Sequence, residues 1–84
     1  MTSILLEAEA IVNGPRAADY GDAAENWANT ARIASAITGL NLEAVDLVLI
    51  MMAVKLARLR TTPNHHDSIV DMAGYAEILS RVTK

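Results

Sequence analysis

The stretch LEAVDLVLIMMAVKLARLR, residues 42–60, decides the fold because it is long and apolar and carries helix signals at both ends. Asn41 is a candidate N-cap, and Glu43 lies in the first turn, where the positive end of the helix dipole favours a carboxylate. Arg60 lies in the last turn, and the residues that follow, TTPN at 61–64, break the pattern. These signals predict a helix over residues 42–60.

This predicted helix is apolar on two opposite sides, each an arc of about 100° on a helical wheel. A helix of this kind is buried on both sides, so either it is central within the monomer or a second subunit covers one side. Both alternatives stay open, and the second predicts a homo-oligomer, most simply a dimer. The first arc holds Val45, Val48, Leu49, Met52, Leu56 and Leu59, and the second, the candidate interface, holds Leu47, Ile50, Met51 and Val54.

Three further helices are predicted around this one. A helical apolar pattern follows Ser3 and stops at Gly14-Pro15. Asp22-Ala-Ala-Glu25 resembles a capping box, and Gly39 ends the helix that it begins. The predicted helices span residues 3–13, 23–38, 42–60 and 65–82. We therefore expect an all-α fold, a compact four-helix bundle-like single domain over residues 1–84, with the third helix the most buried.

Composition narrows the classes of partner. The formal charge is -3 and no block of like charge occurs, so a nucleic acid is not an expected partner. The apolar run at residues 48–54 is far shorter than the roughly 20 residues that span a bilayer, so no membrane partner is expected. The chain has no cysteine, which removes disulfides and thiolate zinc sites and fits a reducing compartment.

A cluster of charges is the candidate ligand site. Asp67 and Asp71 are four residues apart and share one face of the fourth helix. Lys55 and Arg58 come near the end of the third helix, so antiparallel packing would bring all four together. Either they form inter-helical salt bridges, with Asp67 as a helix cap, or they line a pocket that holds a phosphate or a divalent metal. The candidate ligand-binding residues are Lys55, Arg58, Asp67, Asp71, Tyr75 and Tyr20.

Other chemistry-bearing residues carry weaker signals. Asp46 lies between the two apolar arcs and, with Asp71, is a candidate metal ligand. His65-His66 precedes the fourth helix, and the two are expected to be exposed turn residues that titrate near neutral pH. Gly74 in a helix interior indicates that something approaches the backbone closely. No serine lies in a Gly-flanked elbow, so no catalytic residue is assigned.

Several segments carry a resemblance to a known family. They are Asp19-Tyr20-Gly21, Asn26-Trp27, KLARL at 55–59 and DSIVDMAGYA at 67–76. Together they resemble a family of small proteins of unknown function encoded by bacteriophages, especially those of actinobacteria. More distantly, the chain is similar to phage domains associated with nucleotide modification and to MazG-like all-α nucleotide pyrophosphohydrolases.

The resemblance implies a phage accessory protein in the host cytoplasm that acts by non-catalytic binding to a host protein or a nucleotide, without a cofactor. The first alternative is a magnesium-dependent pyrophosphohydrolase of the MazG type. Those enzymes hold magnesium with a Glu-x-x-Glu pair and a later Glu-x-x-Asp pair. Residues 43–46, EAVD, match the later spacing, but no Glu-x-x-Glu precedes them. The second alternative is a purely structural helical oligomer.

Overall fold

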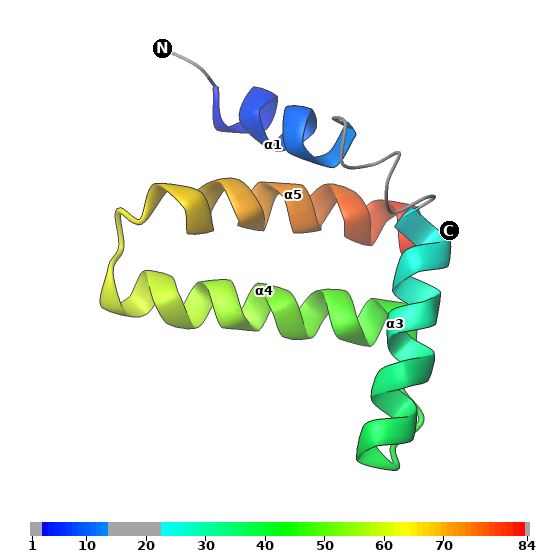
Figure 1. Cartoon of the computed structure of the whole chain (residues 1–84). Coiled ribbons are helices and arrows are strands. Elements are labelled where there is room, and N and C mark those ends of the chain that lie inside the picture. Colours follow the sequence, from blue (N-terminus) through cyan, green and yellow to red (C-terminus); the bar gives the residue numbers. More distant parts are fainter. Residues whose placement is uncertain (1–2, 14–22, 84) are drawn as a thin grey trace.

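The computed structural model describes residues 3–13 and 23–83. In this part of the chain all regular structure is helical (Figure 1). The helices are α1 (Ile4–Asn13), α3 (Ala23–Thr38), α4 (Ala44–Thr61) and α5 (His66–Val82). The predicted all-α, bundle-like arrangement of four helices is confirmed, and each helix boundary lies within two residues of its predicted place. Among the described residues, no helix is long and apolar enough to cross a membrane.

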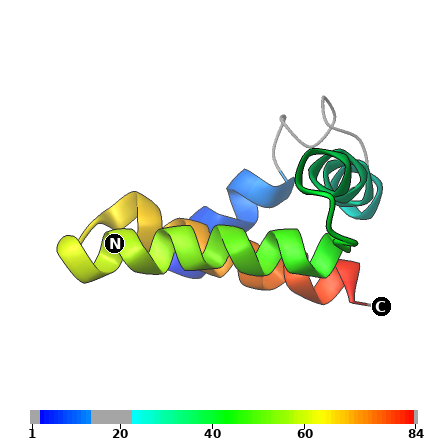
Figure 2. The same ribbon diagram turned by 90° about the horizontal axis from the view of Figure 1, so that it is seen from below.

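Helix α5 occupies the centre of the described structure. It lies between α1 and α4, and α3 crosses the ends of α4 and α5 (Figures 1 and 2). Its buried residues are Ser68, Val70 and Gly74, whereas Val48 is the buried residue of α4. The prediction that the third predicted helix is the most buried is therefore wrong. The reason is topological, because among the described helices α5 contacts the other three and α4 contacts only α3 and α5.

The rotation of α4 about its own axis also differs from the prediction. Val48 is fully buried and marks the inward direction, which falls near the edge of the first apolar arc. Leu49 and Leu56, expected in the core, are 49% and 56% exposed. Ile50 and Val54 from the second arc are 48% and 47% exposed. Each predicted arc is thus split between an inward and an outward part.

The outward parts of both arcs, with two alanines, form one apolar surface that we call the outer face of α4. Figure 2 looks from below onto this side of the molecule, where α4 lies in front of the other helices. Every residue of the face is exposed, and none is charged. The outer face of α4 consists of Leu49, Ile50, Ala53, Val54, Leu56 and Ala57.

The connection between α3 and α4 is built by side-chain hydrogen bonds. Gly39 adopts a positive φ of 75°, a left-handed conformation that ends α3. Ser35 Oγ accepts a hydrogen bond from Leu42 N at 2.9 Å and donates one to Leu42 O at 3.2 Å. The N-cap of α4 is Glu43, whose backbone N–H donates to Asp46 Oδ2 at 2.9 Å. The expected cap, Asn41, lies two residues before the cap that forms.

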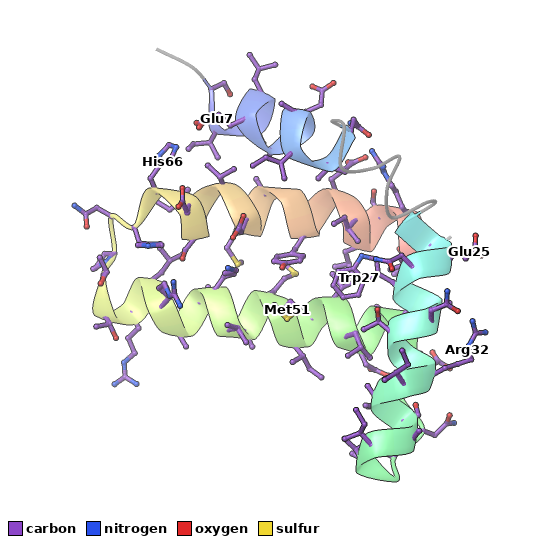
Figure 3. All side chains as sticks on the ribbon, in the orientation of Figure 1. Glu7, Glu25, Trp27, Arg32, Met51 and His66 are labelled. Atoms are coloured by element: carbon purple, nitrogen blue, oxygen red, sulfur yellow. The ribbon has the colours of Figure 1, made fainter. Side chains whose placement is uncertain are left out.

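Helix α1 is joined to α5 near both of its ends. His66 Nε2 lies 2.9 Å from Glu7 Oε1, and Figure 3 shows the two side chains pointing toward each other. At the other end, Arg81 Nη2 donates to Asn13 Oδ1 at 2.8 Å. Between these contacts, α1 packs on α5 with Ala8 buried. Two polar contacts therefore fix the register of a short helix whose one neighbour among the described helices is α5.

Candidate functional site

Lys55 and Asp71 form the centre of the predicted charge cluster. Lys55 Nζ lies 2.8 Å from Asp71 Oδ2, and their side chains are 20% and 32% exposed. The pair links α4 to α5, because these helices run antiparallel on either side of a short turn (Figure 1). Each charge neutralises the other, so the lysine is already engaged with a partner within the chain.

Arg58 and Asp67 do not join this pair. Both side chains are exposed, and neither forms an ion pair within the described ranges 3–13 and 23–83. Arg58 is three residues after Lys55, so its position is turned by about 60° around the helix from that of Lys55. Asp67 lies in the first turn of α5, where its carboxylate complements the helix dipole. The structure therefore brings together two of the four predicted charges.

The two histidines have roles in the packing of α5. His65 is the N-cap of α5, and its Nδ1 accepts from Ser68 N at 3.2 Å and lies 2.7 Å from Ser68 Oγ. The alternative in which Asp67 caps this helix is therefore wrong. His66 is exposed as expected, but it contacts Glu7. The Glu7 carboxylate accepts the hydrogen bond and attracts the imidazolium, which raises the pKa of His66 above its ordinary value.

Asp46 and Asp71, the candidate metal ligands, lie apart. Asp46 already accepts the hydrogen bond from the Glu43 backbone. It is nine residues before Lys55, the partner of Asp71, which corresponds to about 13 Å along α4. Among the described residues, no group of three or more His, Asp or Glu is placed to hold a metal ion. The structure thus gives these two carboxylates separate local partners.

Tyr75 and Tyr20 are the two aromatic residues of the predicted ligand site. Tyr75 packs edge to face with Trp27, with ring centroids 6.1 Å apart and an interplanar angle of 78°. Trp27 lies where α3 crosses the ends of α4 and α5, as Figure 3 shows. Tyr75 therefore contributes an aromatic contact between α3 and α5, a geometry that adds favourable energy to burial. Tyr20 lies outside the described residues.

The prediction that another group approaches the backbone closely at Gly74 is confirmed. A Cβ at Gly74 would lie 3.5 Å from Val12 Cγ2, so the approaching group is a side chain of α1. Beside this contact, a shallow groove of about 470 Å³ runs between α1 and α5, and no pattern in the sequence predicts it. The groove is lined by Leu5, Ala8, Glu9, Asn13, Ala73, Ala76 and Glu77.

The outer face of α4 agrees only in part with the predicted interface. Ile50 and Val54 of that interface are exposed, whereas Leu47 and Met51 are half-buried. The core prediction for Leu49 and Leu56 is wrong, because both side chains are exposed on the outer face of α4. Ala53 and Ala57 also belong to this face, and two small residues four apart are a signal of close helix approach.

Comparison with known proteins places the chain in context. The family model described as Domain of unknown function (DUF6378) matches residues 3–83. The Gene 55 protein of Mycobacterium phage L5 is 42% identical over 81 residues, and that of Mycobacterium phage D29 is 36% identical over 80 residues. Both alignments cover 95% of this chain but 52% and 53% of the relative, so the chain spans about half the length of the curated relatives it matches. No solved structure matches.

Proposed function

We propose that this chain, which belongs to the DUF6378 family, acts by non-catalytic binding to another protein in the cytoplasm of the infected host cell. The family is one of phage proteins of unknown function, as the resemblance implied. The proposal chooses a protein partner over a nucleotide, and binding over hydrolysis. Both choices depend on how α4 distributes its apolar and charged side chains.

The outer face of α4 is the observation that carries the proposal. Between Asp46 and Arg58 the only ionisable residue is Lys55, and its side chain turns inward to Asp71. Four large apolar side chains of this face are each about half exposed. Contiguous exposed apolar surface bordered by charged residues is typical of protein interaction sites. The surface supports a protein partner because it offers apolar contact and no fixed charge.

The charged residues give less support to a nucleotide ligand. A phosphate site places several cationic or backbone donors around one anion. Here Lys55 contacts Asp71, and Arg58 is exposed and forms no ion pair among the described residues. The separate local partners of Asp46 and Asp71 likewise favour binding over a magnesium-dependent reaction. The helix geometry therefore favours the outer face as the functional surface.

A two-part experiment tests this proposal. First, nucleoside triphosphates with magnesium should neither raise the melting temperature of the purified protein nor release pyrophosphate. A rise that Arg58→Ala abolishes, or a release that Asp71→Asn stops, would reject the proposal in favour of a nucleotide site. Second, tagged protein expressed in the host should migrate in a complex larger than its own chain. Ile50→Asp should abolish that complex, and Arg58→Glu, a charge change outside the outer face, should preserve it.

A further inference from the structure

We infer that the partner of the outer face of α4 is a second copy of this chain. The two α4 helices pack antiparallel about a two-fold axis that passes beside Ala53. The inference rests on the proposed function, in which this face binds protein, and it names the partner and the geometry. Its basis is the order of charged, large and small residues along the face, which is self-complementary in the way that a two-fold interface requires.

Charge order selects the antiparallel arrangement. Asp46, Ala53 and Arg60 are spaced by seven residues, so they follow one line along the helix. Asp46 and Arg60 bracket the outer face, and the distance between them along the axis is about 21 Å. In an antiparallel pair centred on Ala53, Asp46 lies opposite Arg60 of the partner subunit, and the same contact forms again at the other end. A parallel pair would instead place like charges together.

The side chains between the charges also match in size. On a helical wheel Ile50 and Ala57 lie on one flank of Ala53, and Leu49 and Leu56 lie on the other. The two-fold axis therefore sets Ile50 against Ala57 of the partner subunit and Leu49 against Leu56 of the partner subunit. A large residue meets a small one on the first flank, and two branched residues meet on the second. At the axis, Ala53 faces its own copy, and two alanines let the helices approach within the usual 8–10 Å separation.

The remaining charges leave this contact undisturbed. Lys55 contacts Asp71 on the opposite side of α4, so no ammonium is desolvated at the interface. Asp46 uses Oδ2 for the Glu43 backbone, which leaves Oδ1 for the Arg60 guanidinium of the partner subunit. Arg60 is exposed and forms no ion pair with the rest of the described chain. Each charge at the ends of the face is thus available to the other copy.

Single-cysteine cross-linking tests the geometry, because the chain has no cysteine of its own. With helix axes about 9–10 Å apart and Cα atoms about 2.3 Å from each axis, two Ala53 Cα atoms lie roughly 4.4–5.4 Å apart. This separation suits a disulfide, so Ala53→Cys should form a covalent dimer under mild oxidation. The matched control is Ala57→Cys, an exposed alanine one turn away. Its two copies lie about 12 Å apart along the axis and should stay unlinked.

A pair of charge reversals tests the contact at the ends of the face. Arg60→Glu places like charges opposite each other twice, so it should raise the dimer dissociation constant by at least about tenfold. Arg58→Glu makes the same change two residues away, outside the face, and should leave the constant within about twofold. Size-exclusion chromatography over a dilution series measures both, and circular dichroism verifies that each variant keeps its helices.

The outcomes separate this inference from the function on which it rests. Cross-linking of both cysteine variants indicates a parallel pair and overturns the antiparallel geometry. A wild-type chain that stays monomeric, with neither variant cross-linked, overturns self-pairing and leaves the outer face to a different protein. Pyrophosphate release by a protein that still cross-links at residue 53 would instead reject the proposed function while the dimer geometry stands.

Discussion

At the residue scale, the two glycines of the described residues carry opposite expectations. Gly39 has a φ of 75°, whereas Gly74 lies inside α5 with Val12 3.5 Å from the place of a Cβ. Ordinary van der Waals contact accepts a methyl group there, and alanine favours a helix by about 0.5–1 kcal/mol over glycine. Gly74→Ala should therefore leave the free energy of unfolding unchanged or raise it by up to about 1 kcal/mol in urea denaturation.

Gly39→Ala is the matched comparison for that substitution. Nothing lies within 4 Å of a Cβ at Gly39, so space does not limit the change. The left-handed backbone conformation limits it, because this conformation costs about 1 kcal/mol or more of free energy for an L-residue with a side chain. The same denaturation experiment should show a loss of about 1 kcal/mol. Equal effects of the two substitutions would contradict this assignment of their backbone roles.

The contact between His66 and Glu7 predicts a pH dependence. The folded protein raises the pKa of His66 above 6.5, chiefly through its hydrogen bond to Glu7 and also through the charges of Glu7 and Asp67. Because the folded pKa exceeds the unfolded one, the contact stabilises the protein fully below about pH 6.5. This contribution is lost as pH rises through the raised pKa.

Thermal melting of wild type and His66→Gln between pH 5.5 and 8.5 measures that dependence. The melting temperature of wild type should exceed that of the variant at the acidic end, and the difference should shrink as pH rises. Glu7→Gln should flatten the profile in the same way, since it removes the other partner. A difference that grows with pH would contradict the proposed linkage between α1 and α5.

At the element scale, the sequence predicts where the helices begin and end, but it does not predict which side of each helix faces its neighbours. Capping signals, Gly39 and the TTPN segment place the ends of α3 and α4 within two residues. The rotation of α4 could not be predicted, because its two apolar arcs are similar and packing alone decides which part faces α5. The central place of α5 was hidden for a related reason, since no local pattern reveals how many neighbours a helix has.

For the candidate site, the sequence likewise predicts which helices carry the charges but not all of the contacts between them. The positions of Lys55 and Asp71 in the sequence predict the correct pair of helices. They do not show whether Lys55 or Arg58 contacts the Asp71 carboxylate, because that depends on the rotation of α4 about its axis. His65 as a cap was missed because the preferred capping residues are Ser, Thr, Asp and Asn. The contact of Glu7 with His66 joins residues 59 apart in sequence, and no local pattern could indicate it.

The ion pair between α4 and α5 gives a prediction at this scale. Lys55→Met keeps the apolar stem of the side chain and removes the charge, which leaves the half-buried Asp71 without its partner. The free energy of unfolding should fall by about 0.5–1 kcal/mol, since partial exposure weakens the pair. Arg58→Met, on the same helix without such a partner, should change it by less. An equal loss in both variants would contradict the separate roles of the two cations.

At the scale of the whole molecule, the described helices leave the apolar outer face of α4 uncovered. Helix α5 contacts α1, α3 and α4, whereas α4 contacts α3 and α5, and no other described helix lies against α4 (Figures 1 and 2). Of the two explanations for a helix apolar on both sides, burial within the monomer is not provided at the outer face of α4 by residues 3–13 and 23–83. Coverage by another protein is the explanation that we propose, and the order of residues on the face favours a second copy.

Sedimentation equilibrium of wild-type protein and Ile50→Asp tests the binding role of the outer face most directly. The wild-type chain should sediment at twice its 9.0 kDa mass at high concentration and dissociate on dilution. Ile50→Asp should raise the dissociation constant by about 100-fold or more, because it places a carboxylate in an apolar contact. A wild-type chain that stays at 9.0 kDa throughout, or a dimer that Ile50→Asp leaves intact, would contradict the assignment of this face as the surface on which the chain pairs.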